Sequence, residues 1–209
     1  MAILTPTEPF LDSGDRLTQA EFHRRYLERP DIRRAELIDG VVYVASPTRF
    51  AFHDEQAADM IFWLKAHTAR HPELRSGGSA TIFLGGDNEV QPDAFLFRPD
   101  APSGARVDAV GYIHGAPGLV VEVAASSANY DLHDKKEAYR RNGVPEYVVW
   151  RVLDEAIDWF RLKDGEYVLV APDEEGVIES AQFPGLRLHM PAMLAGDRAW
   201  VLAELTRSS

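Results

Sequence analysis

Two carboxylates interrupt apolar stretches of the chain and could do chemistry. Asp93 stands inside residues 90–97, and Glu122 stands inside residues 119–124. A carboxylate in the middle of a buried strand is costly unless it is paired, hydrogen-bonded or bound to a metal. Pro92 removes one ladder hydrogen bond and favours the edge or start of a strand, where a site can open to solvent. If the two carboxylates meet, they would bind a hard cation such as Mg²⁺ through oxygen; otherwise Glu122 would pair with a buried arginine.

A lysine on the next predicted helix is the candidate cation. Residues 131–142 have a helical pattern in which Lys135 lies one turn after Asp131 and one turn before Tyr139. Lys135 therefore belongs to the stripe that faces the sheet, where a lysine needs a carboxylate or phosphate partner. Lys136 lies on the other side of the helix and is expected to be a solvated surface charge.

His53 has two interpretations. It lies near the start and on the inward side of a long helix predicted from about Arg49 to Arg70. A histidine at such a place is more often a core or cap residue, but it could also contact a phosphate or order neighbouring side chains. The glycine pairs at 77–78 and 85–86 lack a following Lys-Ser/Thr and helix, so they predict turns and not phosphate loops.

The elements that must position these residues follow from local patterns. Thr18 and Glu21 form a capping-box pattern that predicts a short helix to about Glu28. Residues 34–45 read as a hairpin that turns at Asp39-Gly40, since this pair supplies the positive φ of a tight turn. Further strands are predicted at 80–84, 90–97, 119–124, 146–152, 156–161, 167–170 and 183–188, and a closing helix at 191–205. This order favours an α/β fold with one mixed sheet and helices packed against it.

Composition limits the class of protein. A chain of 209 residues is long enough for one domain with a sizeable core. The absence of cysteine excludes disulfides, thiolate metal sites and cysteine nucleophiles. Neither a secretory leader nor a run of 18 apolar residues is visible, so a cytoplasmic protein without a membrane span is expected.

Charge is unevenly distributed along the chain. The net charge of -11 argues at first sight against a polyanionic partner. Residues 153–180, however, hold nine acids against two bases, whereas residues 16–36 carry six arginines against four acids. A nucleic-acid surface, if present, would therefore lie on the first two-thirds of the chain.

An ordered series of motifs resembles a known family. The series is residues 36–40 (ELIDG), Ser46-Pro47 with His53, Pro92-Asp93, Val121-Glu122-Val123, Asp131 with Lys135 and Tyr139, and residues 143–147 (GVPEY). It is similar to the Uma-two family, a bacterial group classed as endonucleases within the PD-(D/E)XK, or restriction endonuclease-like, superfamily. The resemblance covers roughly residues 18–188. It implies a restriction endonuclease-like core, with a mixed central sheet, flanking helices and an additional C-terminal β-hairpin.

Residues 1–17 contain two prolines and few periodic apolar positions, so an irregular lead-in is expected there. Residues 18–209 are expected to form a single nuclease-like domain with a C-terminal β extension at about 153–190. Two departures from the family pattern concern detail. Ala125-Ser126-Ser127 replaces the usual Ser-Pro-Ser/Thr, and Arg151 stands where the family usually has an aspartate.

Roles for the site residues also follow from the resemblance. Asp93 and Glu122, with the carbonyl of Val123, would hold Mg²⁺, and Mn²⁺ could replace it. Glu36 would add a third carboxylate, and Lys135 would be the catalytic lysine, moved onto the helix because Ala124 stands two residues after Glu122. A second set of residues would support the site, namely His53, Asp131 and Tyr139.

The implied function is magnesium-dependent hydrolysis of phosphodiester bonds in DNA. A homodimer is expected, since cutting both strands needs two sites. Alanine at Asp93, Glu122 or Lys135 is expected to abolish nicking without unfolding the protein. One alternative is a catalytically inactive nuclease-fold protein that binds nucleic acid or regulates a partner. A second is a metal-dependent hydrolase of a small phosphorylated substrate.

Overall fold

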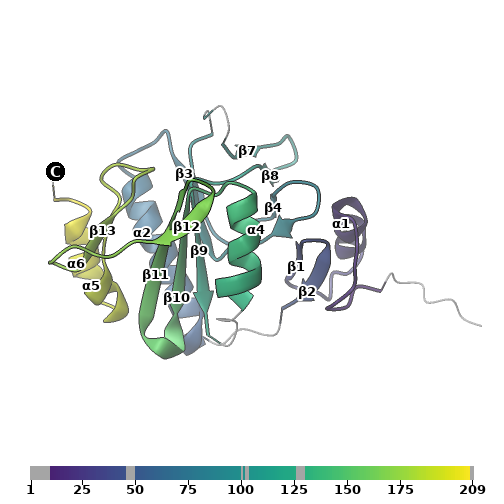
Figure 1. Ribbon diagram of the computed structural model, residues 1–209, viewed down its shortest axis with the longest axis horizontal. Helices are drawn as coiled ribbons and strands as arrows, with labels where there is room; N and C mark the ends of the chain where they lie inside the picture. Colours follow the sequence, from purple (N-terminus) through teal and green to yellow (C-terminus); the bar gives the residue numbers. More distant parts are fainter. Residues whose placement is uncertain (1–9, 46–49, 100, 102–103, 126–129, 208–209) are drawn as a thin grey trace, which may run out of the picture.

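Two large sheets organise the chain. The computed structural model describes residues 10–45, 50–99, 101, 104–125 and 130–207, and in these ranges it contains two six-stranded sheets, a two-stranded sheet and flanking helices (Figure 1). The mixed α/β fold class predicted from the sequence is confirmed, although the strands divide between two sheets and do not form one. Part of the predicted lead-in, residues 1–9, and the Ser46-Pro47 turn lie outside the described residues.

The first sheet, sheet A, has the strand order β2-β1-β5-β4-β8-β7. Only β4 and β8 pair in parallel within it; the other neighbours are antiparallel. Its strands are β1 (Ala35–Ile38), β2 (Val41–Val44), β4 (Ile82–Phe83), β5 (Glu89–Val90), β7 (Arg106–Val107) and β8 (Ile113–His114). The hairpin predicted at residues 34–45 is confirmed, with positive φ at both Asp39 (51°) and Gly40 (74°).

The second sheet, sheet B, has the strand order β12-β11-β10-β9-β6-β3. Its strands are β3 (Arg75–Gly77), β6 (Ala94–Phe97), β9 (Leu119–Ala124), β10 (Glu146–Arg151), β11 (Ala156–Lys163) and β12 (Glu166–Leu169). The strand β9 lies inside this sheet, parallel to β10 and antiparallel to β6. The two-stranded sheet pairs β13 (Val177–Glu179) with β14 (Arg187–His189).

Helices cover both faces of β9. The helical elements are α1 (Gln19–Leu27), η1 (Phe50–Phe52), α2 (Asp54–Thr68), η2 (Asp131–Lys135), α4 (Lys136–Arg141), η3 (Val152–Asp154), α5 (Met190–Leu194) and α6 (Arg198–Glu204). Val121 packs in a core with Trp63 of α2, whereas Val120 packs in a second core with Tyr139 of α4. In Figure 1, α2 passes behind the strands of sheet B and α4 lies on the nearer side. A residue of β9 therefore faces one helix or the other according to its parity.

The stretch around Asp93 is not the single strand that its apolar residues predict. Residues 89–90 form β5 in sheet A, and residues 94–97 form β6 in sheet B. Pro92 lies between them, where it donates no ladder hydrogen bond and the chain passes from one sheet to the other. Asp93 consequently stands at the junction of the sheets and not in the middle of a strand.

Two predicted helices differ from the structure: one begins later in the chain, and the other is divided in two. The long helix expected from Arg49 begins as α2 at Asp54, after the short turn η1. The closing helix expected at 191–205 is divided into α5 and α6, and Gly196 lies between them with φ 69°. None of the helices in the described ranges is long and apolar enough to cross a membrane.

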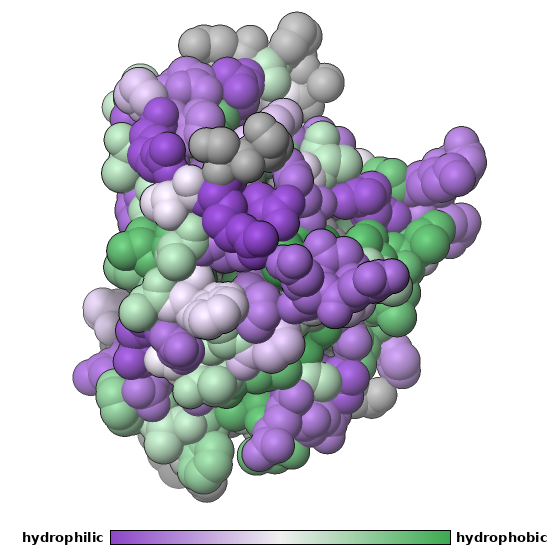
Figure 2. Space-filling model, turned by 90° about the vertical axis from the view of Figure 1, so that its left-hand side faces the viewer, coloured by the Kyte–Doolittle hydropathy of each residue, from purple (hydrophilic) through white to green (hydrophobic). Residues whose placement is uncertain are grey.

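The C-terminal elements pack onto α2. Trp63 donates its indole N–H to the carbonyl of Arg187 at 2.9 Å, and Leu188 and Val201 belong to the same core as Trp63. The face that they expose is turned toward the viewer in Figure 2, where hydrophilic and hydrophobic residues are interspersed. The β13–β14 pair and its helices thus complete the core on the α2 side of sheet B.

Candidate active site

Asp93 joins the two sheets through its carboxylate. Its Oδ2 accepts the backbone N–H of Val123 at 2.8 Å, and its side chain is 4% exposed. This contact ties the connection between β5 and β6 to the end of β9. The two apolar stretches that carry Asp93 and Glu122 therefore come together in the fold.

Glu122 faces α4 from the interior of sheet B. Its Oε1 lies 2.6 Å from Nζ of Lys135 and accepts the hydroxyl hydrogen of Tyr139 at 2.7 Å. The Glu122 and Lys135 side chains are each only 2% exposed. The inward stripe predicted for the helix is thus confirmed for Lys135 and Tyr139. Lys136, expected to be solvated, instead lies over the ring of Phe160 at 3.6 Å, which partly covers it.

A π-helical turn presents Lys135 and Asp131 to the site. Residues 131–135 form this turn, η2, directly before α4. π-helical turns are rare in proteins, and those that do occur are often found at functional sites. Asp131 Oδ1 lies 3.9 Å from Lys135 Nζ, and the Asp131 carbonyl accepts the hydroxyl hydrogen of Tyr147 at 2.9 Å. The turn is therefore anchored to β10.

Glu36 reaches the same ammonium from sheet A. Its Oε2 lies 3.0 Å from Lys135 Nζ, and its Oε1 accepts the backbone N–H of Gln91 at 2.7 Å. Lys135 therefore links a carboxylate of β1 to a carboxylate of β9. The third carboxylate implied by the resemblance does lie in the cluster.

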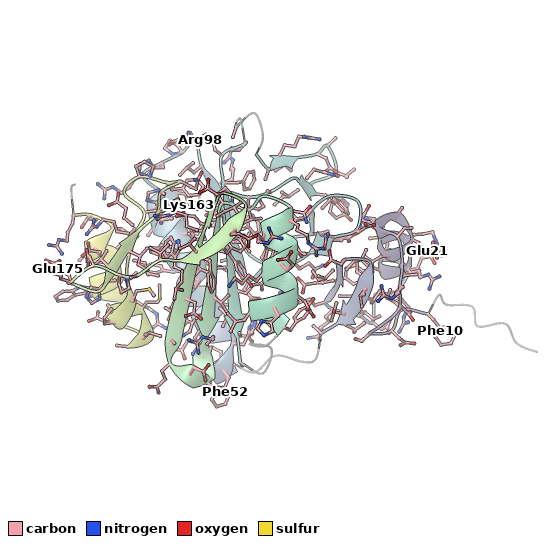
Figure 3. The ribbon with its side chains drawn as sticks, in the orientation of Figure 1. Phe10, Glu21, Phe52, Arg98, Lys163 and Glu175 are labelled. Atoms are coloured by element: carbon pink, nitrogen blue, oxygen red, sulfur yellow. The ribbon has the colours of Figure 1, made fainter. Side chains whose placement is uncertain are left out.

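His53 contacts Asp93 from the segment that precedes α2. Its Nε2 lies 3.2 Å from Asp93 Oδ2, and its Nδ1 lies 3.3 Å from Asp54 Oδ1. It occupies the N-cap position of α2 but makes no side-chain cap hydrogen bond. Figure 3 shows Phe52, the preceding residue, at the lower end of the molecule, the end at which the turn between β10 and β11 also lies. Of the two interpretations, the geometry favours a histidine that orders a neighbouring side chain.

Arg34 is the member of the cluster that the sequence interpretation missed. Its Nη1 donates to Asp93 Oδ1 at 2.8 Å, and its Nη2 donates to the Gln91 carbonyl. The same Nη2 lies 3.8 Å from Glu122 Oε2 and 3.9 Å from Glu36 Oε1. A signal was present, since residues two apart in extended chain share a face, and Arg34 stands two before Glu36. The buried arginine considered as the alternative partner of Glu122 thus exists alongside the lysine.

Burial and mutual attraction set the charges of the cluster. Burial raises the pKa of Glu122 above its ordinary value, although Lys135 opposes this shift. Burial disfavours the ammonium of Lys135, yet the surrounding carboxylates hold its pKa above the ordinary value. Burial also disfavours the charge on Asp93, but the contacts with His53 and Arg34 hold its pKa well below its usual range. At neutral pH, Asp93 and Lys135 are therefore charged.

The donor set fits a hard divalent cation. Arg34 lies 2.8 Å from Asp93 Oδ1 and 3.8 Å from Glu122 Oε2, so each carboxylate has an oxygen that faces this positive side chain. Within the described ranges, no three or more His, Cys, Asp or Glu side chains are arranged to hold a metal by themselves. Magnesium is commonly held by one or two carboxylates and keeps several waters, so two carboxylates suffice.

The seven side chains singled out from the sequence converge at this place, the junction of the sheets. They are Glu36, His53, Asp93, Glu122, Asp131, Lys135 and Tyr139. The contribution of the Val123 carbonyl stays a prediction. Ser126 and Ser127, which depart from the family pattern, lie outside the described residues.

Comparison with known proteins gives a family and a structural relative. A solved structure from Anabaena variabilis ATCC 29413, described as "a putative nuclease belonging to DUF820", is similar with a TM-score of 0.62 and 15% identity. The similarity covers 85% of this chain and 97% of that chain, so the two share a fold. No curated protein matches. A family model described as "Uma2: Putative restriction endonuclease" matches residues 19–191. Because this match spans most of the chain, the protein belongs to the Uma2 family.

Proposed function

We propose that this protein is a metal-dependent endonuclease that hydrolyses phosphodiester bonds of DNA. The observation that carries the proposal is the direct contact of Lys135 with both Glu122 and Glu36, beside Asp93. A buried ammonium held among carboxylates at a sheet junction is costly to build for stability alone. Membership of the family adds to this support.

Asp93 and Glu122, with the Val123 carbonyl, would hold Mg²⁺, for which Mn²⁺ can substitute. When bound, the metal would polarise the scissile phosphate and lower the pKa of a water. The protein's own contribution is to keep these oxygens in place. The Val123 N–H fixes Asp93, and the Tyr139 hydroxyl fixes Glu122.

Lys135 would act on the reacting groups. Its ammonium would orient the attacking water or neutralise the charge that develops on the phosphorane. Glu36 and Asp131 hold this side chain at 3.0 and 3.9 Å. The water oxygen bonds to phosphorus as the bond to the 3′ oxygen breaks, and the 3′ oxygen takes up a proton. The products are a 5′-phosphate and a 3′-hydroxyl.

Nicking of supercoiled plasmid DNA in Mg²⁺ or Mn²⁺ tests the proposal. We expect Glu122→Gln to lower the rate at least about 100-fold, because the variant loses a charged ligand of the metal and with it the metal's electrostatic stabilisation of the transition state. Glu146→Gln is the matched control, since Glu146 is fully buried on the neighbouring strand β10, where it pairs with Arg161 at 3.2 Å. Glu146→Gln should retain wild-type nicking. Equal rates for wild type and Glu122→Gln would refute the mechanism.

A nuclease fold that binds without cutting is the second candidate. Its supporting observation is that Arg34 and Lys135 already neutralise the carboxylates that a metal would need. No nicking by the wild type, together with no metal binding at millimolar concentration, would favour this candidate. Hydrolysis of a small chromogenic phosphodiester that duplex DNA does not inhibit would instead favour a hydrolase of small phosphorylated substrates.

A homodimer is part of the proposal, because a double-strand cut needs two sites. Sedimentation of the purified chain tests it. A dimer should convert nicked plasmid to linear DNA in one encounter, whereas a monomer should accumulate nicked circles first.

A further inference from the structure

The two carboxylates of the candidate metal site each have one oxygen that already serves two partners. Asp93 Oδ2 meets the Val123 N–H and His53. Glu122 Oε1 meets Lys135 and Tyr139. The other oxygens, Asp93 Oδ1 and Glu122 Oε2, are therefore the more available ligands for a cation.

Both of these oxygens face the same side chain. Arg34 Nη1 donates to Asp93 Oδ1 at 2.8 Å, and Arg34 Nη2 lies 3.8 Å from Glu122 Oε2. The Gln91 carbonyl accepts from Nη2 and fixes the orientation of the fork. The guanidinium consequently occupies the place between the two carboxylates.

A divalent cation bound by Asp93 Oδ1 and Glu122 Oε2 would compete with this guanidinium. Magnesium binds oxygen at about 2.0–2.1 Å, closer than the 2.8 Å contact of Arg34 with Asp93 Oδ1. Two positive groups on one oxygen also repel strongly where solvent is scarce. Arg34 is 21% exposed, unlike Lys135 at 2%, so its guanidinium has a route toward solvent that the ammonium lacks.

We propose that Arg34 is a built-in cation that holds Asp93 and Glu122 together without metal and must withdraw when a divalent metal binds. This inference rests on the proposed function, because it concerns the same site. Arg34 is a positioning residue in it. The rival explanation is a permanent structural ion pair, in which Arg34 stays on Asp93 and Glu122 and no metal replaces it.

Metal affinity measured by calorimetric titration with Mn²⁺ separates these explanations. We expect Arg34→Gln to bind Mn²⁺ at least about tenfold more tightly than wild type, since the competing charge is removed. Arg34→Lys keeps a positive charge that competes with the metal, so its Mn²⁺ affinity should stay within about threefold of that of the wild type. The matched control is Arg187→Gln, whose arginine is 20% exposed and pairs with the buried Glu204 at 2.7 Å. Its Mn²⁺ affinity should be unchanged.

Thermal unfolding gives a second readout that does not depend on a tight complex. Without metal, Arg34→Gln should melt below wild type, because its carboxylates have lost a cation. Mn²⁺ should raise its melting temperature more than that of wild type, since a ligand that binds only the folded state stabilises it.

Two results would refute the proposal that Arg34 and a divalent metal compete for Asp93 and Glu122. One is an Arg34→Gln protein that binds Mn²⁺ no more tightly than wild type while melting as a folded protein. If Glu122-dependent nicking persists in the wild type, that result leaves the proposed function intact. The other is an absence of Mn²⁺ binding by both proteins, in which case the nicking assay decides separately whether the proposed function survives.

Discussion

Lys135 is the charge that joins the two halves of the candidate site. Its ammonium lies 2.6 Å from Glu122 on sheet B and 3.0 Å from Glu36 on sheet A. The Lys135 side chain is only 2% exposed, so the cost of burying its charge is offset by the carboxylates around it. The ammonium in turn offsets the cost of burying those carboxylates. From the sequence and its family resemblance, alanine at this position is expected to abolish nicking without unfolding the protein. The contacts predict instead that catalysis and stability are coupled at Lys135.

We expect Lys135→Met to lower the free energy of unfolding by about 3–5 kcal/mol, because it leaves buried carboxylates without their cation. The double variant Lys135→Met with Glu122→Gln should lose less than the sum of the two single variants, since glutamine removes one of those charges. Urea titrations of the four proteins measure this difference. Strictly additive losses would contradict a shared buried charge.

Sequence information at the residue scale was nearly sufficient to find the site. Asp93, Glu122 and Lys135 stand out because a charged side chain inside an apolar pattern requires a partner. Arg34 was not singled out, because its position two residues before Glu36 places it on the same face but does not show that it is buried. Only the fold shows that it reaches Asp93 at 2.8 Å.

At the scale of elements, the structure departs from the pattern where backbone geometry decides. The strand expected at residues 90–97 is divided at Pro92, and the helix expected at 131–142 begins with the π-helical turn η2. Apolar periodicity reports which side chains are buried, and it cannot report which sheet a strand joins. Both departures fall at the candidate site, where local rules are most often broken.

A buried histidine of α2 is expected to make the stability of the protein depend on pH. His67 is 3% exposed and stacks on His71 with ring centroids 4.3 Å apart. Burial lowers the pKa of His67 from 6.5 to about 4. Between these two pH values His67 is protonated in the unfolded chain but not in the folded protein. The free energy of unfolding therefore falls as the pH falls through this window.

We expect His67→Phe to remove this part of the acid sensitivity, because phenylalanine keeps an aromatic ring but does not titrate. The wild type should lose up to about 3 kcal/mol relative to the variant between pH 6.5 and pH 4. Urea titrations at several pH values give the difference. A difference that stays constant across that interval would show that His67 is not protonated on unfolding.

At the scale of the whole molecule, the C-terminal elements belong to the main core. Leu188 and Val201 share a core with Trp63, and Arg70 donates to the carbonyl of Leu205 at 3.1 Å. The acidic segment 153–180 leads into these elements (Figure 2 shows the face that they form). Residues far apart in the sequence thus depend on one another, as expected if residues 18–209 form a single domain.

We expect a chain truncated after Pro172 to lose cooperative unfolding, because the apolar face of α2 around Trp63 would be exposed to water. The milder variant Leu188→Ala should fold but lose about 2–5 kcal/mol. Circular dichroism during thermal unfolding measures both. A truncated chain that still melts cooperatively near the wild-type temperature would show that the C-terminal extension is a separate unit.

The central claim is that Asp93 and Glu122, from separate elements, hold one divalent metal, with Glu36 nearby on Lys135. Cleavage of the polypeptide by hydroxyl radicals generated at bound Fe²⁺, with ascorbate and peroxide, tests it most directly, since the radicals cut the chain next to the metal. The account predicts cuts near residues 36, 93 and 122 that excess Mg²⁺ suppresses and that Asp93→Asn abolishes. Cuts elsewhere in the chain, or the same cuts in Asp93→Asn, would contradict it.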